Sequence, residues 1–505
     1  MRPDKKPSRR SFQAQRLLLL RTLLNAVAAE MRRHGFAGFL RRLPYHLRHL
    51  GSHWRRLAAP PPAGNSLAFE ATPSASRSLR LHPDLCPPAE SIECKISIVI
   101  PTLNAGIEFR WLLCKLVDQQ GIGSLEIVIV DSGSTDGTVQ LARDCGCSVI
   151  EIPSGSFSHG NSRNTGADAA SGDYLLFMVQ DAYPIGNYWI YGMLSFLREH
   201  SDIKLAAVSC AEFSRSDSDM MYDWSIKNHY SFLGCDVFDR IGEFRGEQHT
   251  LLRSYGQLSN VACLMSREIF QEYHFRGDYA EDLDLGIRLI RYGYKVAMLS
   301  SIRVIHSHNR SSRYYLKRSF VDTIYLVRMF DDYAYPCVDS HLGLIAGIAS
   351  SASRLTDWLG QQAPHECHGS AGALLMEWIK QLRKWDIGLQ LASPPNDADT
   401  LDAYLSQLAI KYIPPGWHPD KIARQEARSF FDAFLARLDH FARFVGETYE
   451  SLDSPHMSEV LGAISKNFAA AAGSSLGFMY LDLSKSSGPD RDMAEAIRHE
   501  LSSGV

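Results

Sequence analysis

The 505-residue sequence has no apolar run of the roughly 18 residues that a membrane-spanning helix requires. The nearest candidate, Leu17–Leu20, is interrupted by Arg21. A cleaved signal peptide is the alternative interpretation of this end, because small residues follow at 25–29. Without an export signal, a cytoplasmic location is predicted.

Cysteine pairs and a dominant charge are also missing. The ten cysteines include no CxxC spacing, and Cys145 and Cys147 are too close together for a zinc knuckle. This pattern argues against a metal site built on thiolates and indicates a reducing compartment. The formal net charge of −3 gives the chain as a whole no nucleic-acid-binding signature, so no nucleic acid partner is expected.

The charge that is present is unevenly distributed. Residues 1–56 carry many arginines and lysines but only two acids, Asp4 and Glu30. Apolar residues recur there at helical spacing with arginines between them, which is typical of a helix that lies on an anionic membrane surface. Packing on the rest of the protein and disorder are the alternatives. We predict a basic helical N-terminal arm at 1–56 and a Pro/Ala/Ser-rich linker at 57–93.

After this linker, short runs of β-branched residues alternate with segments whose apolar residues recur at helical spacing. Residues 96–100 and 125–131 have the unbroken apolar character of strands buried on both faces, and 173–181 repeats it. The alternation predicts an α/β domain at 94–330 with a doubly wound, mostly parallel, Rossmann-like sheet. Only helical periods follow, so 331–505 is predicted to be an all-α C-terminal region.

Polar residues follow the predicted strands, where ligands of parallel sheets bind. Asp131 ends the second strand and can accept hydrogen bonds from a base or a ribose, while Ser132 and Gly133 turn the chain. The alternative is an ordinary connection between a strand and a helix. The motif that ends the first strand, at 98–104, pairs with this one and favours a nucleotide site.

Two further clusters suit the phosphates of a ligand. His159 can hydrogen-bond a diphosphate, and Arg163 can place its guanidinium on a phosphate or a base. Loop residues of these types are often only surface residues. Asp181, at the end of the strand predicted at 173–181, can hold a divalent cation that bridges a diphosphate. One carboxylate is a weak metal site, so phosphate oxygens and water would supply most of the other ligands.

The last polar clusters lie near residues 280 and 306. Glu281, Asp282 and Asp284 crowd the start of a predicted helix, where one of them can deprotonate an acceptor hydroxyl. Helix capping is the alternative. His306 and His308 follow a predicted strand, and each is either a metal ligand or a bystander.

In chain order, these motifs resemble those of the inverting GT-A glycosyltransferases of family 2. They are IVIPTLN at 98–104, VIVDSGSTDGT at 128–138, the strand-end Asp181, AEDLDLGIRL at 280–289 and VIHSH at 304–308. FSHGNSRN at 157–164, followed by QDA at 180–182, resembles their rhamnosyltransferase-like branch. The resemblance covers about residues 95–320, which is under half of the chain.

The resemblance implies a role for each matching position. Asp282 matches the catalytic base, with Glu281 beside it, and Asp181 matches the last acid of the metal-binding DxD motif. His306 resembles the C-terminal metal-ligand histidine of many GT-A folds. Thr102 and Asp131 match nucleotide-base contacts. The full set assigned to the nucleotide-sugar donor is Pro101, Thr102, Asn104, Asp131, Ser132, Gly133, His159, Arg163 and Gln180.

One position departs from the family pattern. The DxD motif reads Val179-Gln180-Asp181, so one acid is missing and strict metal dependence stays open. This gap favours the alternative of a non-catalytic GT-A-like scaffold in a glycan assembly complex, whereas Arg163 and the intact acidic pair at 281–282 favour an enzyme. A nucleotidyltransferase would need a Gly-rich loop with a lysine after the first strand, and the chain has none there.

We therefore predict an inverting glycosyltransferase that acts in surface polysaccharide biosynthesis. It would move a sugar, with rhamnose the first candidate, from a nucleoside-diphosphate sugar to a hydroxyl of a glycan or lipid-linked glycan. Mg²⁺ or Mn²⁺ is the expected cofactor. The expected partners are the donor, the acceptor and, through the basic arm, the inner face of the cell membrane.

Overall fold

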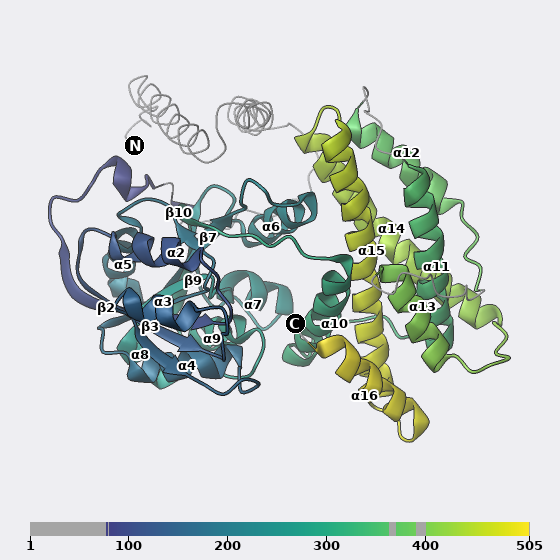
Figure 1. Ribbon diagram of the computed structural model, residues 1–505, viewed down its shortest axis with the longest axis horizontal. Helices are drawn as coiled ribbons and strands as arrows, with labels where there is room; N and C mark the ends of the chain where they lie inside the picture. The colour runs from purple at the N-terminus through teal and green to yellow at the C-terminus, as the bar shows by residue number, and fades with distance from the viewer. Residues whose placement is uncertain (1–76, 79, 363–369, 390–399, 504–505) are drawn as a thin grey trace, which may run out of the picture. The chain divides into compact units, whose positions relative to one another are not determined.

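The computed structural model describes most of the chain after residue 76 (Figure 1). The described residues are 77–78, 80–362, 370–389 and 400–503. The predicted basic arm at 1–56 lies outside them, as do residues 57–76 of the predicted linker.

The chain forms two compact units. The larger contains the described parts of 72–366, 378–441 and 453–505, and the smaller contains those of 367–377 and 442–452. The domain boundaries predicted at 93/94 and 330/331 stay predictions.

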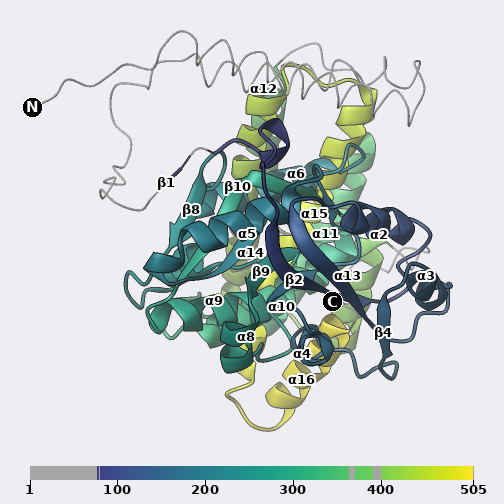
Figure 2. The same ribbon diagram turned by 90° about the vertical axis from the view of Figure 1, so that its left-hand side faces the viewer.

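A mixed ten-stranded sheet, counted over the described residues, forms the centre of the α/β part of the larger unit (Figure 2). Its strand order is β1 (Arg77–Ser78), β8 (Asp239–Gly242), β10 (Lys295–Ile305), β7 (Leu205–Phe213), β9 (Ala262–Ser266), β5 (Tyr174–Met178), β2 (Ile92–Thr102), β3 (Ile122–Asp131) and β4 (Ser148–Glu151). The short β6 (Tyr183–Pro184) pairs with β10.

The direction of the strands decides where the sheet can hold a ligand. β4, β3, β2 and β5 are parallel neighbours, and β7 is parallel to β10. β9 lies between β5 and β7 and is antiparallel to both, so β7 and β10 run in the same direction as β5. The predicted α/β class is confirmed. The sheet is mixed because β9, together with β1, β6 and β8, enters by antiparallel pairing.

Helices cover both faces of this sheet because its strands are apolar on both sides. Ile96, Ile98 and Ile100 of β2 belong to one buried core, and Val99 between them belongs to the other. The first core is closed by α2 (Phe109–Val117), α3 (Thr138–Asp144) and α5 (Trp189–Glu199). The second is closed by α4 (His159–Ala169), α7 (His249–Gly256), α8 (Arg267–Tyr273) and α9 (Glu281–Arg291).

The described end of the predicted linker belongs to this fold. A 3₁₀ turn at Pro83–Leu85 presents the Asp84 carboxylate to the backbone N–H groups of Asn187, at 2.9 Å, and Tyr188, at 2.8 Å. A second 3₁₀ turn, Ser201–Ile203, follows α5. Composition alone did not reveal that Asp84 holds this segment against the residues before α5, and the linker predicted at 57–93 stays a prediction.

Helices make up the described part of the C-terminal region, as predicted, and no strand occurs among its described residues. They are α11 (His341–Gln361), α12 (Ala371–Arg383), α13 (Leu401–Tyr412), α14 (Lys421–Thr448), α15 (Ser454–Leu483) and α16 (Pro489–Ser502), and both α6 (Met220–Leu233) and α10 (Ser312–Met329) precede them in the part predicted as α/β. Among the described helices, none combines the length and apolar character needed to cross a membrane.

The smaller unit is held by a close approach of two glycines. Gly372 of α12 and Gly446 of α14 pack with no side chain between them. The backbone N–H of Ala371 also donates to the carbonyl of Glu450 at 3.2 Å. A larger residue at either glycine would push these backbones apart.

Within the larger unit, α10 packs along α15 through a second pair of glycines. A Cβ added at Gly473 would collide with the carbonyl oxygen of Leu316, and one added at Gly477 would press on Thr323. The α10–α15 contact is therefore set by backbone approach rather than by large side chains.

We expect Gly473→Ala to lower the free energy of unfolding by about 1–3 kcal/mol, because the added methyl overpacks this contact. Gly462→Ala is the matched control, since the space around Gly462 in the same helix is open. That control should be neutral or stabilising by up to about 1 kcal/mol, as for other helical glycines with open space around them. Denaturant unfolding of both variants measures the difference, and equal midpoints would contradict the packing argument.

Candidate functional site

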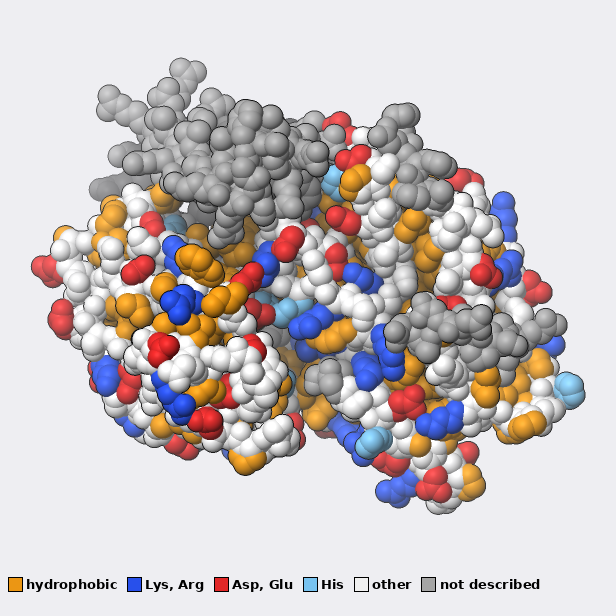
Figure 3. Space-filling model, in the orientation of Figure 1, with side chains coloured by type: hydrophobic (Ala, Val, Ile, Leu, Met, Phe, Trp, Pro, Cys, Tyr) orange, Lys and Arg blue, Asp and Glu red, His pale blue; other side chains and the backbone are white. Residues whose placement is uncertain are grey.

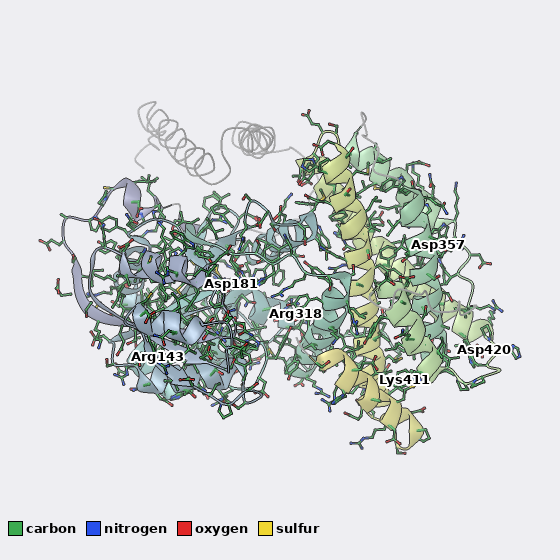
Figure 4. All side chains as sticks on the ribbon, in the orientation of Figure 1. Arg143, Asp181, Arg318, Asp357, Lys411 and Asp420 are labelled. Atoms are coloured by element: carbon green, nitrogen blue, oxygen red, sulfur yellow. The ribbon has the colours of Figure 1, made fainter. Side chains whose placement is uncertain are left out.

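The candidate site lies at one edge of the sheet. β2, β3, β5, β7 and β10 run in one direction, so their carboxyl ends meet there. β9 runs the other way, so its amino end lies at the same edge. The residues collected at these ends are Thr102, Asp131, Asp181, Glu212, Asn260 and His306. Asp181 is labelled in Figure 4.

Asp131 organises the first part of the site. Its carboxylate is buried and accepts hydrogen bonds from the Thr102 hydroxyl at 2.8 Å and from the Ser134 hydroxyl at 2.6 Å. The backbone N–H groups of Gly133 and Ser134 donate to its other oxygen at 3.0 and 2.8 Å. Burial alone would raise the pKa of Asp131, but these hydrogen bonds together lower it. The ionised carboxylate therefore fixes the turn after β3.

Asn104 connects the loop after β2 to the loop after β3. Its backbone N–H donates to the Ser134 hydroxyl at 2.7 Å, and its amide oxygen accepts from the N–H of Thr135 at 2.8 Å. Its φ of 46° is left-handed, a conformation that asparagine tolerates better than most residues. Pro101 and Ser132, predicted with it as donor contacts, are buried beneath these loops.

Gln180 is the middle residue of the Val179-Gln180-Asp181 segment that matches the DxD motif, and Val179 stands where that motif has its first acid. Its amide oxygen accepts from the N–H of Leu103 at 2.9 Å, and its amide nitrogen donates to the carbonyl of the same residue at 3.2 Å. A carboxylate could make only the first of these bonds, because it has no proton to donate. β5 ends at Met178, so the prediction that Asp181 ends the strand is wrong; the chain turns at Gln180 to reach the β2 loop.

Asp181, His306 and His308 form a cluster that could hold a metal ion. One carboxylate oxygen of Asp181 lies 3.5 Å from Nε2 of His306, and the other lies 3.5 Å from Nδ1 of His308. One ligand atom from each of the three residues lies within 4.8 Å of the other two. The cluster supplies one carboxylate and two imidazoles.

A buried glutamate holds His306 in place. The Nδ1–H of His306 donates to the Glu212 carboxylate at 2.7 Å, and the same carboxylate accepts hydrogen bonds from the hydroxyls of Tyr222 and Tyr230, each at 3.0 Å. With Nδ1 occupied, Nε2 is the ring nitrogen that faces Asp181. Metal-ligating histidines commonly donate their second nitrogen to a carboxylate in this way, so the cluster fits a divalent cation.

The pKa values of the two histidines are shifted in opposite directions. Burial alone would lower the pKa of His306, but its hydrogen bonds to Asp181 and Glu212 raise it to about 9. Burial lowers the pKa of His308 to about 4, so this ring is neutral at pH 7. A cation that enters the cluster therefore displaces a proton from His306.

The two predicted catalytic acids have different surroundings at the start of α9. Glu281 is buried and accepts hydrogen bonds from Arg163 at 3.1 Å and from the side-chain amide of Asn260 at 2.8 Å. Asp282 is partly exposed and accepts from the backbone N–H groups of Asn260, at 3.1 Å, and Leu283, at 2.8 Å. Burial and the neighbouring charge of Glu281 raise the pKa of Asp282 to about 6.

The segment with His159 and Arg163 lies beneath these acids. α4 begins at His159, where the Ser158 hydroxyl caps the helix by accepting a hydrogen bond from the N–H of Asn161. A Cβ on Gly160 would lie 2.6 Å from the carbonyl oxygen of Gly277, so close packing requires this glycine. Arg163 is buried and also donates to the carbonyl of His159 at 2.9 Å, and burial lowers the pKa of His159.

The structure thus brings the predicted site residues to one sheet edge, with three contributors that the sequence did not reveal. Ser134 bonds Asp131, Asn260 bonds both acids of α9, and Glu212 bonds His306. Glu212 had a usable signal, because it is a lone carboxylate at the end of the apolar run at 205–213. Asn260 had none, since its role depends on the reversed direction of β9.

Comparison with known proteins identifies the fold that carries this site. Residues 97–273 match the model of glycosyl transferase family 2. Over 231 residues the chain is 30% identical to the O-antigen chain rhamnosyltransferase RfbN of Salmonella typhimurium, an alignment that covers 45% of this chain and 70% of that protein. The chain belongs to glycosyl transferase family 2.

Other known proteins resemble this family 2 glycosyltransferase at lower sequence identity. It is 26% identical over 220 residues to the amylovoran biosynthesis glycosyltransferase AmsB of Erwinia amylovora, covering 41% of this chain and 68% of that protein. It also resembles a solved structure of the mannosyltransferase PcManGT from Pyrobaculum calidifontis in complex with GDP-Man and Mn²⁺. The sequence identity is 15% and the TM-score is 0.37, and the match covers 59% of this chain and 75% of that one. The predicted family and enzyme class are confirmed.

We expect Glu212→Gln to weaken Mn²⁺ binding by about 10- to 100-fold, because the amide no longer fixes the His306 ring through a charged hydrogen bond. Glu126→Gln is the matched control, a partly buried glutamate that bonds Ser97 and Ser171 and none of the cluster residues. Calorimetric titration of Mn²⁺ into both full-length variants measures the effect. Unchanged affinity in Glu212→Gln would show that Glu212 does not support a metal ligand.

Proposed function

We propose that this family 2 glycosyltransferase transfers a sugar with inversion, in a single displacement, from a nucleoside-diphosphate sugar to a glycan hydroxyl. The observation that carries the proposal is the difference between Glu281 and Asp282 at the start of α9. Glu281 is buried and ion-paired to Arg163, whereas Asp282 is partly exposed at the site edge with a raised pKa. A carboxylate with these properties is suited to act as a general base.

Asp282 is proposed to take the proton of the acceptor hydroxyl as its oxygen bonds to the anomeric carbon. The bond from that carbon to the diphosphate oxygen breaks at the same time, and the nucleoside diphosphate leaves with the electron pair. Glu281 acts as a positioning residue: its bonds to Arg163 and Asn260 hold the start of α9. Accurate placement of the base and the hydroxyl accounts for much of such a rate enhancement.

The loops after β2 and β3 are the proposed cradle of the nucleotide, with Asp131, Thr102 and Asn104 setting their shape. Asp181, His306 and His308 would hold the divalent cation. When bound, the cation supplies positive charge to the departing diphosphate. Two imidazoles beside one carboxylate suit Mn²⁺ better than Mg²⁺, which prefers oxygen ligands.

The similarity to O-antigen and amylovoran enzymes supports a role in surface polysaccharide assembly, with a glycan or lipid-linked glycan as acceptor. Rhamnose is the proposed donor sugar because the 30% identical relative is a rhamnosyltransferase. Contact of the arm at 1–56 with a membrane surface remains a prediction, and the arm lies outside the described residues.

Asp282→Asn should reduce transfer by about 10²- to 10⁴-fold while nucleotide-sugar binding persists, because the amide cannot accept the proton. The matched control is Asp284→Asn on the same helical turn, whose carboxylate instead pairs with Arg288 at 2.8 Å. Release of nucleoside diphosphate from a panel of donors measures transfer, and calorimetry measures donor binding. Turnover close to wild type in Asp282→Asn would remove Asp282 from the role of base. An inactive wild-type chain on every donor would favour the non-catalytic scaffold.

The raised pKa of Asp282 also predicts a pH dependence. The base must be ionised, so kcat should reach a plateau above its pKa of about 6 and fall about tenfold per pH unit well below it. The measurement is kcat against pH at saturating Mn²⁺ and donor, with Asp284→Asn expected to keep the same acid limb. A rate independent of pH through this range would contradict the assignment.

A further inference from the structure

A cavity in the helical part of the larger unit has cationic walls. Its volume is about 430 Å³, and it lies between α10, α13 and α16, away from the sheet edge described above. The residues that line it are Arg313, Lys317, Tyr404, Lys411, Ala496, His499, Glu500 and Ser503. Lys411 is labelled in Figure 4, and Figure 3 shows Lys and Arg side chains on this face of the helical region.

Two of these cations have no acid at salt-bridge distance among the described residues, although Glu500 attracts Lys317 at longer range. Glu500 is the one acid in the lining, and it pairs with Lys411 at 2.9 Å. Lys317 donates only to the carbonyl and hydroxyl of Ser503, at 2.8 and 3.2 Å, both neutral acceptors. Arg313 stacks over the ring of Tyr404 at 4.2 Å, and among the described residues neither Arg313 nor Lys317 forms a salt bridge.

Arg313 and Lys317 repel one another. They lie one turn apart on the same face of α10, and like charges at this spacing destabilise a helix. Burial and the neighbouring charge of Arg313 lower the pKa of Lys317. An anion in the cavity would relieve this repulsion. A guanidinium with two ammonium groups suits the several oxygens of a phosphate group, which arginine can bind with two parallel hydrogen bonds.

We propose that this cavity is a binding site for a phosphate or diphosphate group, held by Arg313 and Lys317 of α10 and Lys411 of α13. It is separate from the proposed donor site and does not depend on the proposed function. The group can belong to a soluble diphosphate or to a lipid head group, since both present the same oxygens.

The test is calorimetric titration of inorganic pyrophosphate into the full chain, without divalent cation so that the Asp181 cluster does not contribute. Saturable binding is expected in the wild type, with affinity at least about tenfold lower in Arg313→Gln/Lys317→Gln, which removes two phosphate contacts. The matched control is Lys421→Gln/Arg424→Gln, two exposed cations at the start of α14. This control should bind like the wild type.

Ala496→Glu is a second variant that keeps every existing contact. It places an acid on the exposed rim of the cavity and should weaken pyrophosphate binding without unfolding the helix. Absence of binding in the wild type, or wild-type affinity in both cavity variants, would overturn the proposal.

Competition between pyrophosphate and phosphatidylcholine vesicles that contain phosphatidic acid distinguishes the two sources of the group. Displacement of pyrophosphate from the wild type by these vesicles, together with weaker vesicle binding by Arg313→Gln/Lys317→Gln, assigns the site to a lipid head group, because the basic residues at 1–56 are the same in both proteins. Pyrophosphate binding that such vesicles leave unchanged assigns it to a soluble diphosphate. Neither result depends on transfer by Asp282, so failure here and failure of the proposed function can be told apart.

Discussion

Glu281 accepts hydrogen bonds from Arg163 and Asn260, and this buried cluster joins three elements that are far apart in the sequence. Arg163 comes from α4, Asn260 from the turn before β9, and Glu281 from the first residue of α9. Removing one partner of a buried ion pair typically costs about 3–5 kcal/mol, because the other charge is left unpaired in a poorly solvated place. The cluster therefore fixes the point at which α9 starts.

That fixed point determines the environment of Asp282. Ala280 directly before the cluster has a left-handed φ of 53°, which costs an alanine about 1–2 kcal/mol and persists only where the surroundings hold it. The next two side chains then separate: Glu281 turns into the protein, and Asp282 stays partly exposed. One buried pair thus creates both the position of the proposed base and, through the charge of Glu281, part of the rise in its pKa.

The metal cluster also combines residues that can bind a ligand with residues that hold them in position. Val179 replaces the first acid of the DxD motif, and the amide of the neighbouring Gln180 forms two hydrogen bonds to Leu103 that shape the loop after β2. His308 joins Asp181 and His306 as a third potential ligand, and Glu212 orients His306 from below. The site therefore exchanges one carboxylate for imidazole nitrogens, which changes the cations that suit it.

The sequence by itself determined the α/β class, the family and the approximate position of each polar cluster. It did so because buried strands are unbroken apolar runs, and because ligand-binding residues follow them at their carboxyl ends. Thr102, Asp131, Asp181 and His306 were found in this way, and Asp282 was found in the acidic cluster at the start of a predicted helix. The resemblance named Asp282 as the base, whereas only the tertiary structure decided how differently Glu281 and Asp282 are surrounded and which residues support His306. Those outcomes depend on contacts between distant segments and on the reversed direction of β9, and no local pattern of residues encodes either.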